Sequence, residues 1–163
     1  MTPKADIGVV GLGVMGSNLV LNMDDHGYVV AVWNRTASTV DDFLGGPARD
    51  TAVIGTHSLE ELVASLAKPR RILLMVKSGS PVEDLIGRLQ PMLDEGDIII
   101  DGGNSLYTDT IDRARRLEAA GLAFIGAGIS GGEAGARTGP SIMPAGTASA
   151  WPSVRPIFQD IAA

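Results

Sequence analysis

Short, continuous apolar runs separated by helix-like segments constrain the fold of this chain more than any other feature of its sequence. The runs are continuous rather than alternating, which is typical of strands buried on both faces of a parallel sheet. Strands that alternate with helices along a chain build doubly wound α/β domains. The sequence therefore predicts a doubly wound α/β domain of the Rossmann type, with a mostly parallel sheet and helices on both faces. The predicted strands are Ile7–Val10, Tyr28–Trp33, Ile72–Val76, Ile98–Asp101, Ala123–Ile125 and, as a sixth candidate, Ser141–Met143.

Helical patterns lie between these runs. Ser58, followed three residues later by Glu61, forms a capping-box signature at the start of a helix over Leu59–Leu66. Gly121 follows another helical pattern and has the residue type that commonly ends a helix. A length of 163 residues suits one domain, residues 1–163. The remaining helical segments are the repeat Met15, Leu19 and Met23, then Val82–Leu89, Thr108–Ala119 and a helix that begins near Ala150.

A glycine motif lies between the first predicted strand and the first helix. Its residues are Gly11, Leu12, Gly13, Val14, Met15 and Gly16, a G-x-G-x-x-G sequence. In this context the first glycine permits a tight turn, the second lets a pyrophosphate approach, and the third lets helix and strand pack closely. The helix N-terminus offers free amides and partial positive charge to phosphates. The motif therefore predicts a dinucleotide site, with Met15 near its nicotinamide end.

The end of the second predicted strand indicates which dinucleotide binds. NAD enzymes place a carboxylate there, about 20 residues after the glycines, to accept hydrogen bonds from the ribose 2′-hydroxyl. This chain has Asn34, Arg35 and Thr36 instead, with no acidic residue. A guanidinium binds a 2′-phosphate through a bidentate fork and stacks on adenine. The sequence therefore predicts NADP as the cofactor.

Composition argues against several other classes of protein. A net charge of −6 and a pI near 4.8 disfavour a nucleic-acid-binding face. The chain has no cysteine and two histidines, so no metal site is predicted, and both His26 and His57 are interpreted as structural. No apolar run is long enough for a membrane span and no signal-peptide pattern is present, which favours a cytoplasmic protein.

Several further motifs resemble those of the 6-phosphogluconate dehydrogenase family over essentially the whole chain. The loop Met75–Gly79 is similar to the family's MVK-x-G, with Ser78 in place of alanine. Ile99–Ser105 reads IIDGGNS, and Ser130–Arg137 resembles SGGEEGAR with Ala134 in place of the second glutamate. Gly139–Gly146 resembles GPSIMPGG with Ala145 in place of a glycine, and the chain ends in the family's FQ-x-IAA pattern. The glycine motif at Gly11–Gly16 and the NRT sequence at Asn34–Thr36 are shared with the wider β-hydroxyacid dehydrogenases. The DGGNS, SGGE and GPSIMP sequences together are more specific to this family.

This resemblance implies roles for individual residues. It implies that Asn104 touches both coenzyme and sugar, and that Ser130, Gly131 and Gly132 hold the substrate near its carboxylate and reacting carbon. Glu133 and Arg137 are given no catalytic role and are interpreted from their residue types as a surface pair. In the complete enzyme, substitution of Asn104 or Ser130 is expected to lower kcat/KM and to change the melting temperature little. The implied coenzyme contacts are Gly11–Gly16, Asn34–Thr36, Val76, Lys77, Ser78 and Asn104.

The resemblance also implies an activity: NADP-dependent oxidative decarboxylation of 6-phosphogluconate to ribulose 5-phosphate and CO2, in the pentose phosphate pathway, by a homodimeric parent enzyme. It implies that the lysine base and glutamate acid lie in a helical domain beyond residue 163, so that no acid–base catalyst lies in this chain. Two alternatives remain: a 3-hydroxyisobutyrate-type dehydrogenase, which shares the glycine fingerprint, and a stand-alone NADP-binding module without catalysis.

Overall fold

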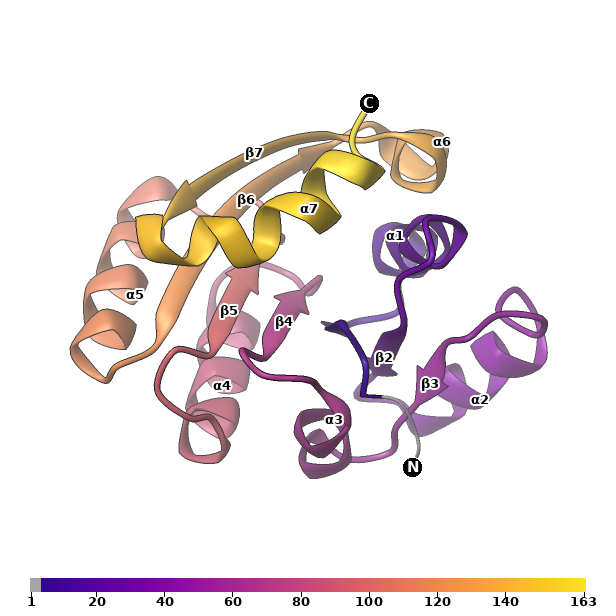
Figure 1. Ribbon diagram of the computed structural model, residues 1–163, viewed down its shortest axis with the longest axis horizontal. Helices are drawn as coiled ribbons and strands as arrows, with labels where there is room; N and C mark the ends of the chain where they lie inside the picture. The colour runs from indigo at the N-terminus through magenta and orange to yellow at the C-terminus, as the bar shows by residue number, and fades with distance from the viewer. Residues whose placement is uncertain (1–3) are drawn as a thin grey trace.

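The computed structural model describes residues 4–163, so the predicted domain of residues 1–163 is described from Lys4 onward. Within this range seven strands form a single sheet in the order β3-β2-β1-β4-β5-β6-β7 (Figure 1). Neighbouring strands are parallel except β7, which runs antiparallel to β6. The predicted doubly wound, mostly parallel fold is confirmed. The strands are β1 (Ile7–Val10), β2 (Val30–Trp33), β3 (Ile54–Gly55), β4 (Arg71–Leu74), β5 (Ile98–Asp101), β6 (Ala123–Ser130) and β7 (Ser141–Gly146).

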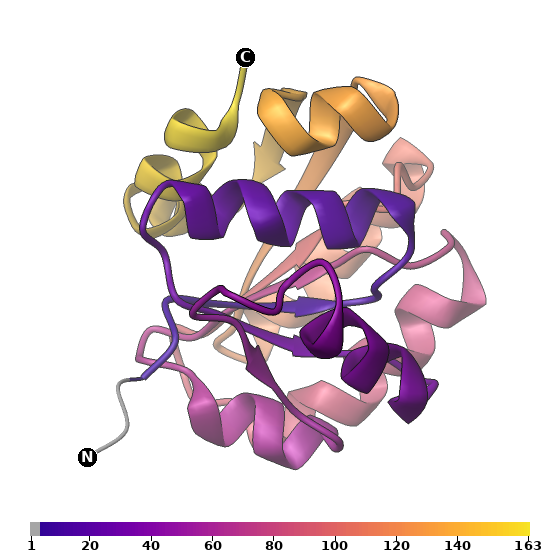
Figure 2. The same ribbon diagram turned by 90° about the vertical axis from the view of Figure 1, so that its right-hand side faces the viewer.

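Helices cover both faces of the sheet (Figure 2). Two hydrophobic cores lie between these helices and the sheet, one on each face. Successive strand residues point to opposite faces: Ile98 and Ile100 enter one core, and Ile99 enters the other. This double burial explains why the central strands are apolar along most of their length. One face carries α1 (Val14–Asp25), α2 (Ala37–Gly45), α6 (Gly132–Thr138) and α7 (Trp151–Ile161); the other carries α3 (Leu59–Ser65), α4 (Ser80–Leu89) and α5 (Tyr107–Ala119). Short 3-10 turns occupy Gln90–Met92 and Ala148–Ala150.

Several element boundaries differ from the predicted ones. β2 begins at Val30 rather than Tyr28, since the Tyr28 amide still donates to Met23 O at the end of α1. β4 ends at Leu74, so Met75 and Val76 belong to the following loop. The predicted strands at Ala123–Ile125 and Ser141–Met143 are both longer because they pair with each other antiparallel as far as Ser130 and Gly146.

Three elements were not predicted: α2, β3 and α6. The helix α2 buries only Val40 and Phe43, which is too few for a recognisable apolar stripe. The strand β3 is two residues long. The helix α6 contains Gly132 and Gly135, a residue type that disfavours helix interiors. Each of these elements is specified by tertiary packing more than by its own sequence.

The predicted capping box at α3 is confirmed in slightly modified form. The Ser58 hydroxyl accepts a hydrogen bond from the Glu61 amide at 3.0 Å. The Glu61 carboxylate accepts from the amide of His57, one residue before the usual partner, at 2.9 Å. His57 also pairs with Asp41 on α2 through its Nε2 at 2.8 Å, so its contacts tie α2 to the start of α3.

A buried asparagine joins three of the four helices on one face of the sheet. Asn22 on α1 is 1% exposed, and its side-chain amide donates to Ala136 O of α6 at 3.1 Å and to Ile161 O of α7 at 3.0 Å. Unpaired carbonyls at helix C-termini need partners when they are buried. Asn22 therefore fixes the ends of α6 and α7 against α1.

Replacing Asn22 with Leu should lower the free energy of unfolding by about 1–3 kcal/mol, because two buried carbonyls lose their donor. Urea unfolding followed by circular dichroism measures this change. Asn18→Leu is the matched control: Asn18 lies one turn earlier on α1 and donates only to Val14 O within the helix. Equal losses in the two variants would contradict the role given to Asn22.

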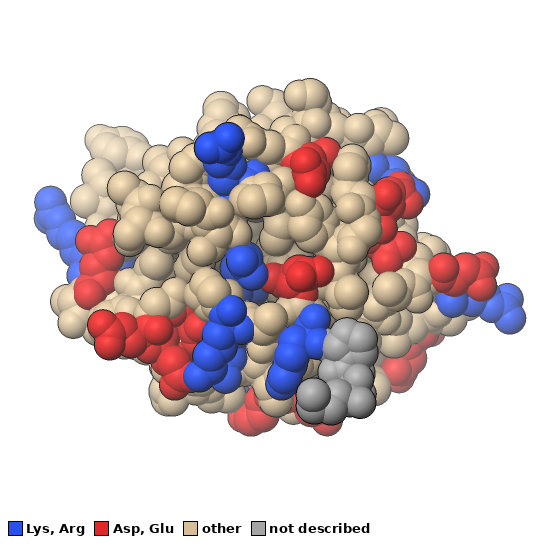
Figure 3. Space-filling model, in the orientation of Figure 1, with Lys and Arg blue, Asp and Glu red and all other residues tan. Residues whose placement is uncertain are grey.

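In the part of the chain that the structure describes, none of the helices has the length and apolar character needed to cross a membrane. In the orientation of Figure 3, basic and acidic side chains are interspersed over the visible face.

Candidate functional site

The order of the strands creates a crevice at the carboxyl ends of β1 and β4. β1 pairs with β2 on one side and with β4 on the other, so the chain winds in opposite directions from this point. In doubly wound sheets ligands bind at such a switch point, where the loops on either side diverge. The glycine loop follows β1, residues 34–36 follow β2, and residues 75–79 follow β4. Three of the predicted segments therefore meet at one edge of the sheet.

Two of the fingerprint glycines are required by close backbone contacts. Gly11 has φ +102°, and a Cβ there would lie 2.3 Å from the carbonyl oxygen of Met75. A Cβ at Gly16 would lie 2.0 Å from the carbonyl oxygen of Gly11. These contacts let α1 pack directly on the loop after β1 and bring that loop against the loop after β4. The positive φ of Gly11 fits the tight turn predicted for the first glycine, and the close contact at Gly16 fits the packing role predicted for the third.

Gly13 differs from the other two glycines. It is the N-cap of α1 with φ −71°, and a Cβ built on it meets no atom within 4 Å. No side chain caps the helix there, and the first turn contains no acidic residue. The free amides and the positive end of the helix therefore face open space, which is the arrangement that binds phosphate. Val14 is exposed, and Met15 is half-buried against the core of this face.

Asn34, which directly follows β2, holds the glycine loop in place through its side chain. Its side-chain oxygen accepts a hydrogen bond from the Leu12 amide at 2.9 Å, and its side-chain nitrogen donates to Thr36 O at 3.3 Å. Asn34 thus connects the loop after β2 to the loop after β1. Its role includes positioning, which the sequence motif alone did not reveal.

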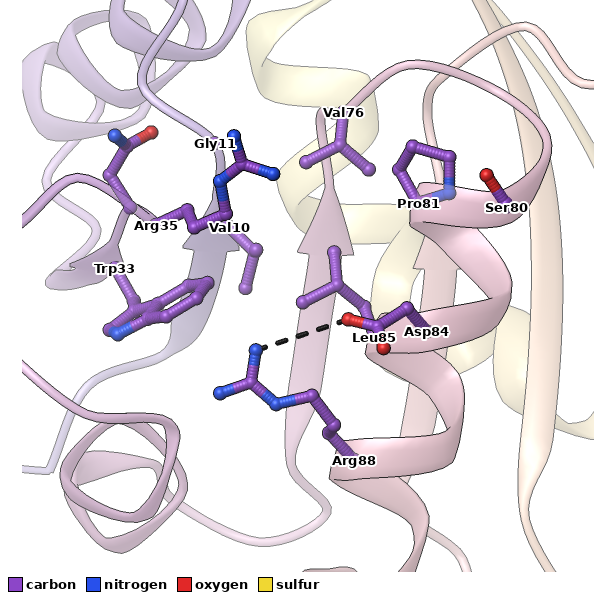
Figure 4. Close-up of a pocket in the computed structure, with 11 residues that line it drawn as sticks. Val10, Gly11, Trp33, Arg35, Val76, Ser80, Pro81, Asp84, Leu85 and Arg88 are labelled. Atoms are coloured by element: carbon purple, nitrogen blue, oxygen red, sulfur yellow. Dashed lines mark ion pairs between the residues drawn. The ribbon is translucent and has the colours of Figure 1, made fainter.

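A cavity of about 450 Å³ opens beside these loops (Figure 4). Arg35 lies at its rim and is exposed. Among residues 4–163 no carboxylate lies within ion-pair distance of the Arg35 guanidinium, so its charge is available to an anionic ligand. Four predicted residues, Gly11, Asn34, Arg35 and Val76, come together here. The full lining is Val10, Gly11, Trp33, Asn34, Arg35, Val76, Ser80, Pro81, Asp84, Leu85 and Arg88.

Sequence reasoning missed the wall of this cavity that α4 contributes. Arg88 reaches from α4 towards Trp33 at the end of β2, with its guanidinium carbon 5.5 Å from the ring centroid (Figure 4). The Oδ2 atom of Asp84, one turn earlier on α4, lies 4.0 Å from Nη1 of Arg88. The i, i+4 spacing of Asp84 and Arg88 is visible in the sequence, but only the tertiary structure places them opposite Trp33. The α4 wall thus combines the apolar Pro81 and Leu85 with the charged Asp84 and Arg88, and it faces the Trp33 ring.

The other predicted residues lie along the same edge of the sheet but outside this cavity. Thr36, Lys77 and Ser78 are exposed in the loops after β2 and β4. Asn104 lines a second cavity of about 470 Å³ between the loop after β5, the helix α5 and β6. Its φ is +56°, the left-handed region that a side chain other than glycine rarely adopts.

The Asn104 side chain makes structural hydrogen bonds, although the residue lies in an exposed loop. Its side-chain oxygen accepts from the Ile129 amide at 3.1 Å, and its side-chain nitrogen lies 3.4 Å from Ile129 O. The expectation that substitution would leave stability almost unchanged therefore needs correction for Asn104. Removing its side chain leaves the Ile129 amide without its partner, which costs about 1–3 kcal/mol if water does not replace it.

The serine–glycine–glycine segment begins at the end of a strand rather than inside a loop. Ser130 is the exposed last residue of β6, and Gly132 is the first residue of α6. Gly131 has φ +141°, and a Cβ there would lie 3.0 Å from Gly135 Cα. The strand thus turns into α6 within one residue, which only glycine allows here. Arg137 pairs with Asp25 on α1, so the predicted surface pair with Glu133 is wrong.

The family of the chain follows from sequence comparison. A sequence profile described as the NAD binding domain of 6-phosphogluconate dehydrogenase matches residues 6–163. The chain belongs to this family. The human decarboxylating 6-phosphogluconate dehydrogenase is 59% identical over 160 residues, which cover 98% of this NAD-binding domain and 33% of the human protein. The Haemophilus influenzae enzyme is 58% identical over 163 residues, 34% of its length. The domain therefore spans about a third of the length of the curated relatives that it matches.

Solved structures agree with this assignment. The NAD-binding domain superposes on Plasmodium falciparum 6-phosphogluconate dehydrogenase with a TM-score of 0.92 and 38% identity, covering 97% of this chain and 34% of that one. Mycobacterium tuberculosis 3-hydroxyisobutyrate dehydrogenase gives a TM-score of 0.82 at 24% identity, over 98% of this chain and 52% of that one. At that identity the second likeness shows a shared fold only. The family resemblance expected from DGGNS and GPSIMP is confirmed.

Proposed function

We propose that this chain binds NADP and is the coenzyme-binding part of a decarboxylating 6-phosphogluconate dehydrogenase. The observation that carries the proposal is the cavity at the switch point, with the unpaired Arg35 guanidinium at its rim and open space above Gly13. The Plasmodium falciparum relative is described in complex with its cofactor NADP+ and in complex with its substrate 6-phosphogluconate. Two features of this chain fit that cofactor: the Arg35 guanidinium at the cavity rim could pair with a 2′-phosphate, and the open space at Gly13 leaves the α1 N-terminus accessible to a pyrophosphate.

The coenzyme would lie across the carboxyl edge of the sheet. Its pyrophosphate would approach the α1 N-terminus at Gly13, and its adenine would enter the cavity between Trp33 and α4. Arg35 would hold the 2′-phosphate through charge-assisted hydrogen bonds. When bound, NADP supplies the acceptor for a hydride. Further proposed contacts along the edge are Gly11, Leu12, Val14, Met15, Gly16, Asn34, Thr36, Val76, Lys77, Ser78 and Asn104.

The sugar acid would lie beyond the nicotinamide, beside Asn104 and the turn from β6 into α6. Ser130 offers a hydroxyl, and Gly131 and Gly132 leave the backbone open to a carboxylate. The second cavity, which Asn104 lines, reaches β6 at Gly126, Ala127 and Gly128, on the strand that leads to this turn. These four residues are the substrate contacts that we propose within this chain.

The acid–base chemistry of the proposed reaction needs residues outside these 163. Oxidation at C3 of 6-phosphogluconate produces a β-keto acid, and the ketone accepts the electron pair as CO2 leaves, so no metal is required. The base, the acid and the phosphate-binding residues would belong to the other two thirds of a protein as long as its relatives. We propose that this complete enzyme is a cytoplasmic homodimer.

Isothermal titration of the 163-residue chain tests the coenzyme proposal. NADP should bind at least about tenfold more tightly than NAD, since one charge-assisted contact to the 2′-phosphate contributes about 1.5–3 kcal/mol. The chain alone should form no NADPH from 6-phosphogluconate at 340 nm, because general acid–base groups contribute about 10²–10⁴-fold each. Equal affinity for NAD and NADP would contradict the proposed cofactor. Steady NADPH formation by the pure chain would contradict the proposal that the acid–base residues lie outside these 163 residues.

A stand-alone NADP-binding module is the second candidate function. Its one supporting observation is that the residues of this chain form the cavity at the switch point by themselves. Reading the gene downstream of residue 163 separates the two functions: a helical extension with a lysine and a nearby glutamate would establish the enzyme.

A further inference from the structure

A buried arginine lies behind the loop that carries Asn104. Arg113 on α5 has a side chain that is 2% exposed and is the largest fully buried side chain among the described residues. Neither the glycine fingerprint nor the proposed coenzyme contacts involve it. A buried guanidinium is tolerated only when carboxylates and hydrogen-bond acceptors surround it. Its partners therefore show what it holds in place.

Those partners come from three different segments. Arg113 Nη1 lies 3.3 Å from Asp101 Oδ2 at the end of β5 and 3.1 Å from the Ser105 hydroxyl. Arg113 Nε donates to Glu83 Oε1 on α4 at 2.7 Å. Asp101 is as deeply buried as the arginine, with 1% of its side chain exposed. The fork of one guanidinium thus joins β5, the loop that follows it and α4.

The same carboxylate closes the loop. Asp101 Oδ1 accepts from the Gly103 amide at 2.9 Å, and Asp101 Oδ2 accepts from the Ser105 hydroxyl. Asn104 lies between these two anchors in its left-handed conformation. Because this conformation is sparsely populated, it persists only where surrounding contacts hold it. The Asp101–Arg113 pair supplies those contacts on either side of Asn104, at Gly103 and Ser105, while the Asn104 side chain adds its own hydrogen bonds to Ile129.

Both sides of this loop meet other parts of the proposed site. A Cβ at Gly103 would lie 2.5 Å from Val76 O, so the loop contacts the coenzyme loop after β4. The Asn104 side-chain oxygen accepts a hydrogen bond from the amide of Ile129, the residue before Ser130. A shift of residues 103 and 104 would therefore change both neighbours.

We propose that Arg113 is a positioning residue that holds Asn104 in register with the coenzyme loop and with Ser130. The positioning itself is a property of the free chain, whereas its effect on ligands rests on the proposed function. Arg113 touches neither ligand; it acts through Asp101, Ser105 and Asn104.

Arg116 provides the matched control for Arg113, because both arginines donate to the carboxylate of Glu83. Burial alone would raise the pKa of Glu83, but hydrogen bonds from Arg113 and Arg116 outweigh it and lower that pKa. Arg116 contacts the same carboxylate at 2.9 Å from the next turn of α5, yet it is 48% exposed and does not contact the loop. Arg113→Lys and Arg116→Lys are thus the same substitution on one helix, beside the same partner. Lysine keeps the charge but lacks the fork that reaches several acceptors at once.

Amide hydrogen exchange of the free chain tests the positioning. Arg113→Lys should speed exchange at Gly103 and Ile129 by about tenfold or more, because protection reports the local opening equilibrium. Arg116→Lys should leave both amides unchanged. Unchanged exchange at Ile129 in Arg113→Lys, or an equal increase in both variants, would overturn the proposal. If Arg113→Lys does not fold, Ser105→Ala removes one anchor of the loop, and the same increase at both amides is expected; its absence counts against the proposal equally.

Titration with NADP tests the consequence for the site. Arg113→Lys should weaken NADP about tenfold, as small misplacements of binding groups do, and should add nothing further in an Asn104→Ala background. Full additivity of the two substitutions would show that Arg113 does not act through Asn104. Failure of the unsubstituted chain to bind NADP would count against the proposed function and would leave the exchange result to decide the positioning.

Discussion

Replacing Arg35 with Ala should weaken NADP binding about ten- to a hundredfold and leave NAD binding almost unchanged. Charge-assisted hydrogen bonds contribute about 1.5–3 kcal/mol each, and Arg35 directly follows the end of β2, in the region where NAD enzymes carry a carboxylate. Its guanidinium lies at the rim of the cavity. Isothermal titration of the chain with each nucleotide measures the two affinities.

Arg155→Ala on α7 is the control for Arg35→Ala, since Arg155 is also exposed and contacts only Gln159 one turn away. It should change neither affinity. Arg88 provides a second comparison because it faces the same cavity over Trp33, where it would contact the base that both nucleotides share. Equal losses of NAD and NADP in Arg35→Ala would mean that Arg35 acts on the adenine and not on the 2′-phosphate.

The parallel strands were predictable because burial on both faces of the sheet requires a continuous apolar run, which is visible in the sequence. Ile98, Ile99 and Ile100 alternate between two cores, so all three had to be apolar. The length of β6 was not predictable in the same way. Gly126 and Gly128 interrupt its apolar run, and only pairing with β7 extends it to Ser130. Antiparallel pairing at the edge of a sheet is a tertiary property.

The positions of the candidate site residues were predictable where a motif directly follows a strand. The glycine loop and Asn34–Thr36 each follow a recognisable strand, so their positions at the carboxyl edge could be deduced. Trp33, Asp84 and Arg88 could not, because their role depends on how α4 packs beside β2. The hydrogen bond from the Leu12 amide to Asn34 joins residues 22 positions apart and leaves no periodic signal.

Gly13→Ala and Gly16→Ala should separate ligand binding from folding within one motif. At Gly13 a methyl group meets no protein atom within 4 Å and φ is −71°, so alanine fits the free chain. Alanine is a poorer N-cap than glycine, which costs less than about 1 kcal/mol. At Gly16 the methyl group would lie 2.0 Å from Gly11 O, and overpacking of this kind costs about 1–3 kcal/mol or more.

The open space above Gly13 is where the pyrophosphate should approach the α1 amides. A methyl group there would push the phosphates away from those amides, so Gly13→Ala should weaken NAD and NADP alike by about tenfold or more, equivalent to about 1.4 kcal/mol. Titration with both nucleotides and urea unfolding, performed on both variants, give a two-by-two comparison. Gly13→Ala should lose affinity with nearly normal stability, and Gly16→Ala should lose stability first. Normal affinity in Gly13→Ala would place the pyrophosphate elsewhere, and because the loss is expected for both nucleotides it is distinguishable from the NADP-selective loss in Arg35→Ala.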